Sequence, residues 1–323
     1  MDVKVMLFCM SIFFIISSIW FFLFHPCGHI QVPSPYFVLQ DEGPNFNKLP
    51  DLRSVVHTYT ERPKDDSNDT SLFDAKLSTD QYNSLENILN QFERMMVQLK
   101  LQNQWFLGVS SLLGSLQHHD VVPWSDGIDI FAPDHFRREI LYALSVFAYN
   151  LTLFPYGLQD RLYLNEMSLD QSSPFVEINY YAIHIPNFGI SIGGEYRFFK
   201  LDDVFPLVYR PFGRHWRPAP RKPINFLKYY LPIVEQTCTF HSFRSQYMPP
   251  IVVNCEELMN KFPFVNRCPI PQSEIVGEYL EQCDEYLVYP NGESAHKIRT
   301  VLDSNEVKSL LYTARYTSFE CPK

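Results

Sequence analysis

The sequence predicts a mixed α/β domain in which helices pack against a sheet of parallel and antiparallel strands. Three observations favour this class. Residues 78–99 carry apolar side chains at helical spacing, residues 121–131 form an apolar run of strand length, and further strand-like runs follow after another helical segment. An apolar fraction of 46% in 323 residues supports a packed core.

The first element is a predicted helix. Ser78 and Gln81 have the spacing of a capping box, in which each side chain bonds the backbone of the other residue. An apolar stripe follows at three- and four-residue intervals, made of Leu85, Ile88, Leu89, Phe92, Met96 and Leu99. We expect this stripe to face the core.

The next elements alternate between strand and helix. A short strand from Trp105 turns at residues 108–111 into a helix with Leu112, Leu113 and Leu116, and residues 121–131 give a strand that ends near Ala132. Asp134 is predicted to cap a helix whose apolar face holds Phe136, Ile140, Leu141, Leu144 and Phe147. Strands are expected at 161–167, 174–185 and 189–199. Trp124 and Phe131 are assigned to the core.

Beyond residue 231 the pattern weakens into stretches with Cys and Pro, with short helices such as 304–312. We therefore assign residues 78–232 to the α/β domain and residues 233–323 to a Cys-rich extension packed on it.

The amino-terminal segment predicts a membrane anchor. Residues 5–24 hold no charged side chain, and about twenty apolar residues cross a bilayer as a helix. A cleaved signal peptide is the alternative, but the run is long and ends in bulky residues from Trp20 onward. Lys4 favours a cytoplasmic end at residues 1–4. Residues 25–77 then form a luminal stem, and we expect a single-pass type II protein of the Golgi or the ER.

Glycan and cysteine signals agree with a luminal domain. Asn68 and Asn150 begin acceptor sequons for N-glycosylation. In an oxidising compartment the late cysteines predict disulfides, with Cys27 as a sixth partner or one thiol left free. The alternative is a structural zinc site, because Cys238 and His241 have metal-ligand spacing. The residues concerned are Cys238, His241, Cys255, Cys268, Cys283 and Cys321.

Two acids interrupt the strand-like run at 121–131. On a strand, Asp129 shares its face with Gly127, so Asp126 and Asp129 lie on one face only if the strand begins after Asp126. A surface turn at residues 125–127 is the alternative interpretation of Asp126. The net charge of −9 argues against nucleic acid as a partner.

The wider context resembles a known family. Residues 110–131 (SSLLGSLQHHDVVPWSDGIDIF) and residues 201–230 (LDDVFPLVYRPFGRHWRPAPRKPINFLKYY) are similar, in the same order, to two motifs of the LicD family, which includes fukutin and fukutin-related protein. The resemblance covers about residues 100–232, the size of one domain.

The resemblance implies a nucleotidyltransferase-like fold and a metal-dependent transferase. Its substrates would be a CDP-activated donor of a phosphate-linked group, such as phosphocholine or ribitol phosphate, and a glycan of a glycoprotein. By position, Asp129 and Glu177 match acids that bind Mg²⁺ or Mn²⁺, and Ser110 and Ser111 match a turn that cradles phosphate.

Two departures leave the activity open. Gly127 stands where the family places its first metal-binding acid, and Gln117 stands where it often has Arg. Asp126 could replace the missing acid, because Gly127 gives the backbone freedom. The alternative is a catalytically lapsed member that binds glycans or acts as a scaffold, in a homo- or hetero-oligomer within a glycosylation complex.

A basic segment follows in an otherwise acidic chain. Its members are predicted to meet donor phosphates or an anionic glycan, with a solvated loop as the alternative: Arg214, His215, Arg217, Arg221 and Lys222. Asp202 and Asp203 are candidates to ligate metal or to order this segment. His118 and His119 either assist proton transfer or border the site.

Overall fold

The computed structural model of the protein describes residues 73–75, 77–147, 150–165, 174–184, 189–192, 195–230, 237–240, 251–269, 280–303 and 319–321. The predicted anchor, most of the stem, Asn68, His241 and the helix expected at 304–312 lie outside these residues. None of the helices within the described ranges combines the length and the apolar character that a membrane span requires.

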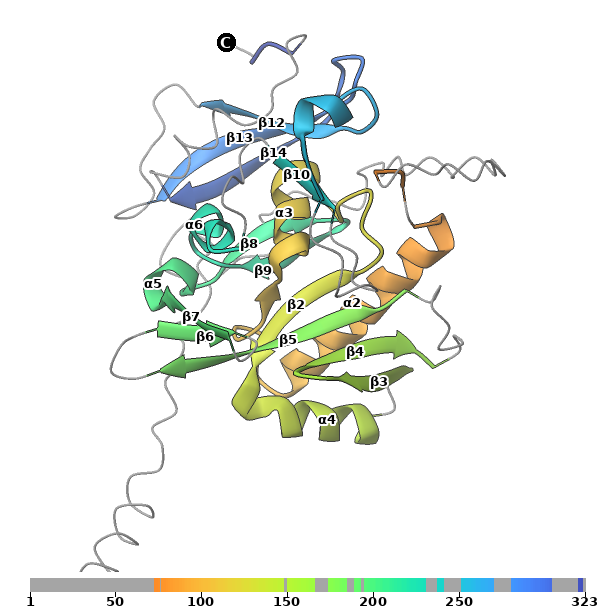
Figure 1. Ribbon diagram of the computed structural model, residues 1–323, viewed down its shortest axis with the longest axis vertical. Coiled ribbons are helices and arrows are strands. Elements are labelled where there is room, and N and C mark those ends of the chain that lie inside the picture. Colours follow the sequence, from red (N-terminus) through yellow and green to blue (C-terminus); the bar gives the residue numbers. More distant parts are fainter. Residues whose placement is uncertain are drawn as a thin grey trace, which may run out of the picture. The chain divides into compact units, whose positions relative to one another are not determined.

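A mixed sheet forms the centre of the fold, as the sequence predicts (Figure 1). Its strands run in the order β1 (Phe106–Leu107), β2 (Ile128–Pro133), β5 (Val176–His184), β4 (Gln159–Leu164) and β3 (Leu151–Tyr156). β6 (Gly189–Ile192) and β7 (Glu195–Lys200) continue from β5. β2 and β5 pair in parallel, and the other pairs are antiparallel.

Helix α2 (Thr79–Gln98) covers one face of this sheet. Ser78 accepts a bond from the backbone N–H of Gln81, and the Gln81 side chain accepts one from the backbone of Ser78, which confirms the predicted capping box. The buried side chains include Leu85, Ile88, Leu89, Phe92 and Met96 of the predicted stripe, and the helix contacts β4, β5 and α4.

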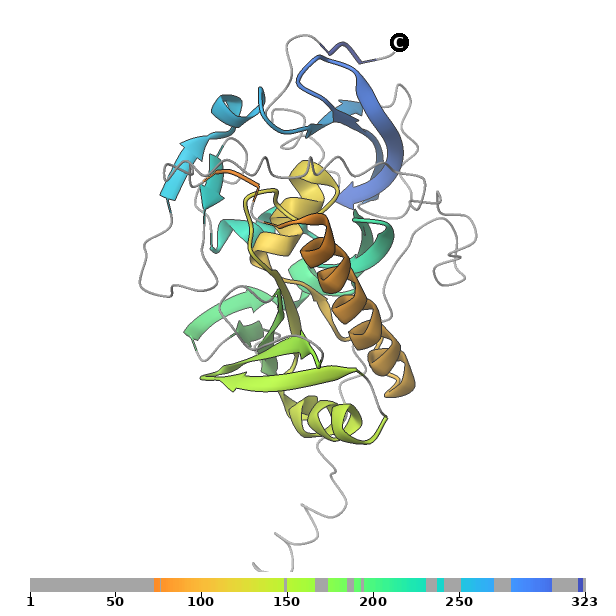
Figure 2. The same cartoon turned by 90° about the vertical axis from the view of Figure 1, so that its right-hand side faces the viewer.

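Helix α3 (Val109–His118) follows β1 directly, with Gly108 as its N-cap residue. It contacts β2, β8 and β12, and Figure 2 shows it between the central sheet and the strands drawn in blue. The predicted strand, turn and helix at 105–117 are confirmed. Trp124 and Phe131 are buried, as expected for core residues.

Two sequence predictions need correction around the sheet. Asp134 opens a short 3₁₀ turn, η3 (Asp134–Phe136), and α4 (Arg137–Val146) begins after Phe136 with no side-chain cap. The single strand expected at 189–199 is divided into β6 and β7, which pair as antiparallel neighbours.

Asn150 is exposed just before β3, so the backbone leaves that sequon at the surface, and its glycosylation stays a prediction.

The segment after β7 contains elements that the sequence pattern did not reveal. α5 (Leu201–Val204) precedes a hairpin of β8 (Val208–Phe212) and β9 (His215–Ala219), and α6 (Pro223–Lys228) follows. Gly213 turns the hairpin with a φ of +60°, which glycine adopts without strain, and its N–H donates to the carbonyl of His119. This bond ties the hairpin to the end of α3.

The carboxy-terminal part is built mainly of strands in its described residues. β10 (Thr237–Phe240) pairs with β11 (Ile251–Asn254), which leads into the short η4 (Cys255–Leu258). β12 (Phe264–Pro269), β13 (Leu280–Val288) and β14 (Ser294–Asp303) form an antiparallel sheet.

Two disulfides join the described cysteines. Cys238 pairs with Cys255, and Cys268 pairs with Cys321. A sulfur in a disulfide has no thiolate charge to offer a metal, so these pairs favour the disulfide alternative over a zinc site. Cys283 is a buried thiol, and burial raises its pKa to about 12.

A buried ion cluster connects β13 to the central domain. Glu285 is fully buried; its Oε2 lies 2.8 Å from Arg210 of β8 and 2.8 Å from His119, and its Oε1 lies 2.9 Å from Arg267 of β12. Burial opposes ionisation of Glu285, but Arg210 and Arg267 outweigh it and hold the pKa well below the usual range. Glu285 is therefore a carboxylate that three other elements surround.

Candidate functional site

The site forms where β2 and β5 run side by side. Asp129 and Glu177 are direct partners in the parallel register, so their side chains leave the sheet on the same face. Both are buried, with 4% and 5% of their surface exposed. The structure thus brings together the two acids that the family resemblance singled out.

The amino-terminal end of α3 holds the carboxylate of Asp129. Its Oδ1 accepts bonds from Ser110 Oγ at 2.6 Å, Ser111 N at 2.8 Å and Ser111 Oγ at 2.8 Å, while Oδ2 lies 3.3 Å from Ser110 N. Ser111 Oγ also accepts the backbone N–H of Asp129 at 2.9 Å. Free N–H groups at a helix start favour a negative charge, and here that charge is Asp129 itself.

Gly108 allows the Asp129 carboxylate to lie close to the start of α3. A Cβ atom at this position would lie 2.3 Å from Oδ2 of Asp129 and 2.9 Å from its backbone carbon, closer than such atoms come in proteins. The backbone N–H of Gly108 also donates to the carbonyl of Asp129 at 2.8 Å. The glycine before α3 therefore serves the contact between a helix end and a carboxylate.

Asp126 joins the site through its charge. It precedes the first residue of β2, so strand alternation does not turn it away from the face that bears Asp129. Gly127 and Ser125 bond each other in the turn before the strand.

The environment of Glu177 reflects this gathering of acids. Burial raises its pKa, the ion pair with Arg161 opposes the rise, and the charges of Asp129 and Asp126 add to it, so that the pKa reaches about 7. A carboxyl group that titrates near neutrality beside two other acids is typical of functional sites. The three predicted acids are thus electrostatically linked.

Arg161 is a member of the site that the sequence interpretation missed. It lies on β4 directly opposite Glu177, and its Nε and NH2 atoms lie 3.1 and 3.0 Å from Oε2 of that residue. Its guanidinium stands 3.8 Å from the ring centre of Tyr156 and 4.4 Å from that of Phe175. The only signal in the sequence was its position at the start of a predicted strand.

These residues fit a divalent cation that arrives with phosphate. Among the described residues, no three His, Cys, Asp or Glu side chains converge on one metal position. Mg²⁺, however, is commonly held by one or two carboxylates together with substrate phosphates. Asp129 and Glu177 supply such a pair. Burial is the main cause of the raised pKa of Glu177 and the charge of Asp129 adds to it, and a cation would offset both.

The basic segment makes its contacts on the other side of β2. Arg217 is almost fully buried and bonds Glu93 and Asn90 of α2, and Lys222 Nζ lies 3.0 Å from Asp203. Successive strand residues face opposite ways, so Ile128, which lines a pocket beside Arg217, points away from the face of Asp129. These contacts pair the segment with acids of the protein itself.

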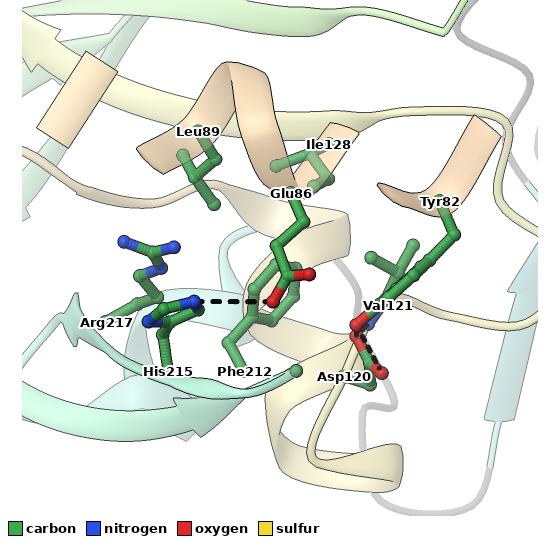
Figure 3. A pocket seen from close by; sticks show the side chains of 10 residues that line it. Tyr82, Glu86, Leu89, Asp120, Val121, Ile128, Phe212, His215 and Arg217 are labelled. Carbon is green, nitrogen blue, oxygen red and sulfur yellow. Dashed lines mark hydrogen bonds and ion pairs between the residues drawn. The ribbon is translucent and has the colours of Figure 1, made fainter. Parts of the chain in front are cut away.

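That pocket is a cavity of about 240 Å³, including the part open to solvent, between α2 and the β8–β9 hairpin (Figure 3). His215 Nε2 lies 3.3 Å from Glu86 Oε1, and Tyr82 donates its hydroxyl to Asp120 at 3.0 Å. Arg214, which is 45% exposed, stands 3.9 Å from Glu86. Arg221 donates its backbone N–H to the carbonyl of Val204, and a role of the segment in phosphate binding stays a prediction.

The remaining candidates lie in structural settings. His118 is buried with Nδ1 2.8 Å from the carbonyl of Pro263, and burial lowers its pKa to about 4. His119 belongs to the Glu285 cluster, and its Nδ1 lies 2.9 Å from Nε2 of His296. Asp202 is exposed. Gln117 donates to the sulfur of Cys255 at 3.6 Å.

Comparison with protein-family models matches residues 102–222 to LicD/FKTN/FKRP, nucleotidyltransferase domain. The segment that resembles the LicD/fukutin family thus matches the family's nucleotidyltransferase domain, and this segment contains Asp129, Arg161 and Glu177. Among solved structures, a crystal structure of the lincosamide antibiotic adenylyltransferase LnuA with bound lincomycin is 16% identical, covers 47% of this chain and 85% of that chain, and has a TM-score of 0.29. No curated protein matches the sequence.

Proposed function

We propose that the protein is a transferase that moves a phosphate-linked group, of the polyol phosphate or phosphocholine type, from a CDP-activated donor to a glycan of a glycoprotein. The observation that supports this most is the Asp129–Glu177 pair, whose Asp129 is bound by the start of α3, inside a segment that matches the family's nucleotidyltransferase domain. In this proposal the domain works in the Golgi or ER lumen, anchored by residues 5–24.

The chain's own residues would bind and orient the donor. Asp129 has its direction fixed by Ser110 and Ser111, and Glu177 has its direction fixed by Arg161. A bound Mg²⁺ or Mn²⁺ would offset the negative charge of the donor phosphates. Transfer joins the oxygen of an acceptor hydroxyl to the phosphorus of the transferred group, breaks the phosphoanhydride bond and releases CMP, and the hydroxyl proton passes to solvent. The buried setting limits water, which strengthens every charge interaction with the phosphates.

A lapsed family member that binds glycans or supports a complex is the second candidate. Gly127 contributes no carboxylate, the Asp129 carboxylate already accepts several bonds, and Glu177 is paired with Arg161. A site with fewer acids binds a divalent cation less strongly. This candidate predicts an intact fold with little affinity for a metal–nucleotide complex.

Calorimetric titration of the purified full-length chain in detergent with CDP-ribitol and CDP-choline, with and without Mn²⁺, separates the two candidates. Variants Asp129→Asn and Gly127→Asp are titrated beside it, and Glu139→Gln, at an exposed acid of α4, is the control. We expect Mn²⁺-dependent binding that Asp129→Asn abolishes and the control retains. Binding that appears only in Gly127→Asp would favour the lapsed member, and no binding by any variant would contradict the CDP-linked donor.

A further inference from the structure

We propose that Arg161 is a positioning residue for Glu177 and prepares the Asp129–Glu177 pair to receive a metal–nucleotide complex. The inference rests on the proposed function and concerns a side chain outside the acidic and basic motifs of the sequence. It follows from the register of three strands, from the packing of the guanidinium between two rings, and from the fact that Arg161 bonds only one oxygen of the Glu177 carboxylate.

The three residues form one row across the sheet. Asp129 of β2 is the register partner of Glu177 of β5, and Glu177 is in turn the register partner of Arg161 of β4. Partners in neighbouring strands project from the same face, so the row presents two carboxylates and one guanidinium side by side. The positive charge stands at the end of the row beyond Glu177, away from Asp129.

Two aromatic rings fix the guanidinium of Arg161. Tyr156 and Phe175 lie 3.8 and 4.4 Å from it, and only 7% of the residue is exposed. A guanidinium stacked on rings is favoured electrostatically and has few alternative conformations. Arg161 therefore provides a rigid support rather than a mobile surface charge.

The ion pair uses only one oxygen of Glu177. Both Nε and NH2 of Arg161 donate to Oε2, so the orientation of the carboxylate is set while Oε1 takes no part in this pair. Such an arrangement suits a ligand that must offer an oxygen in a fixed direction. Lysine could supply the charge but not the planar fork that sets the direction.

The charge of Arg161 also opposes the repulsion between the acids. Burial and the charges of Asp129 and Asp126 disfavour ionised Glu177, and Arg161 acts against both. Gly127 stands where the family has an acid, so the site has fewer carboxylates. The placement of each remaining carboxylate therefore matters more for binding a cation. Without Arg161 we expect Glu177 to lose both its charge partner and its orientation.

The chain contains a matched control on the opposite face of the same strand. Arg137 donates from Nε and NH2 to Asp160 at 2.9 and 2.7 Å, and its guanidinium lies 4.8 Å from the ring centre of Tyr180. Asp160 immediately precedes Arg161 on β4, so this second ion pair faces away from Asp129. It resembles the Arg161 pair in chemistry but not in location.

The test compares Arg161→Met, Arg161→Lys and Arg137→Met in the full-length chain. Affinity for Mn²⁺ alone is measured by electron paramagnetic resonance, affinity for CDP with Mn²⁺ by calorimetry, and folding by thermal unfolding. We expect Arg161→Met to weaken binding of CDP with Mn²⁺ at least tenfold and Arg161→Lys to weaken it several-fold. Arg137→Met should lower the unfolding temperature and leave the affinity within about twofold.

The outcomes separate this inference from the proposed function. If the native chain binds CDP with Mn²⁺ and both Arg161 variants bind it equally well, the positioning role is overturned while the proposed function stands. If the native chain binds neither Mn²⁺ nor the nucleotide, both are overturned. Should Arg161→Met not fold, Arg161→Lys decides, because it keeps the charge between the rings and changes only the fork.

Discussion

Asp129 and Glu177 are direct neighbours on parallel strands, yet separate parts of the fold hold them in place. Asp129 is bound by the start of α3, and Glu177 by Arg161 of β4. Neither carboxylate moves away from the other without breaking its own bonds. The folded protein therefore holds two carboxylates close together despite their repulsion, and a cation bound between them would offset this repulsion.

Gly108→Ala should disable this arrangement without changing a polar atom. The added Cβ would meet Oδ2 of Asp129 at 2.3 Å, so that carboxylate must leave the end of α3. We expect at least a tenfold loss in calorimetric affinity for CDP with Mn²⁺. Ser145→Ala is the control, because it changes an exposed side chain of α4 that lies outside the site. Equal affinity of native and Gly108→Ala chains would show that the position of Asp129 is unimportant.

The raised pKa of Glu177 predicts a pH dependence of stability. A carboxyl whose pKa rises from 4.5 to about 7 on folding stabilises the fold below its ordinary pKa, and this contribution is lost as the pH rises through 7. Relative to Glu177→Gln, the native chain should lose on the order of 3 kcal/mol in free energy of unfolding between pH 4.5 and 8. Urea unfolding at several pH values checks this, and a constant difference between the two chains contradicts it.

Glu285→Gln should be strongly destabilising. It removes a carboxylate that pairs with both Arg210 and Arg267, and breaking a buried ion pair costs about 3–5 kcal/mol because charge is left uncompensated. Asp284→Asn is the neighbouring control. Its partners Lys297 and Arg299 are 46% and 50% exposed, so the expected loss is about 1 kcal/mol or less. Urea unfolding of both variants at neutral pH measures the contrast, and similar losses would argue against the buried cluster.

The cysteines should behave differently under alkylation. Peptide mapping of the unreduced protein should find Cys238 joined to Cys255 and Cys268 joined to Cys321. Cys283 should resist iodoacetamide at pH 8 until the chain unfolds, because its thiol is buried and its raised pKa disfavours the reactive thiolate. Labelling of Cys283 in the folded protein would contradict the structure.

Local sequence patterns predicted the helices and strands that depend on residues close to one another in the chain. The capping box and apolar stripe of α2, the turn into α3 and the strand that bears Asp129 all follow from spacing within about twenty residues. The partnership of Asp129 with Glu177 came from the family resemblance, since strand order is not visible in one sequence.

Arg161 and the basic segment show what local patterns could not predict. Arg161 joins the site because β4 pairs with β5 in one register, a non-local choice that would place it on the other face if shifted by one residue. Arg217 is predicted to meet phosphate, and its contact with Glu93 of α2, more than a hundred residues earlier, was not visible in the local sequence. The strands β12–β14 lack a clear alternation in the sequence because both of their faces contain polar partners.

The Glu285 cluster bears on whether the segment that matches the family can fold by itself. The family match ends at residue 222, but Arg210 and His119, which lie inside it, both bond Glu285 on a strand more than fifty residues beyond that boundary. A fragment that ended at residue 222 would expose apolar side chains that pack against the carboxy-terminal part. It would also leave Arg210 buried without its carboxylate partner. The matched segment is therefore not a complete folding unit in this chain, and moving it into a relative requires β12–β14 as well.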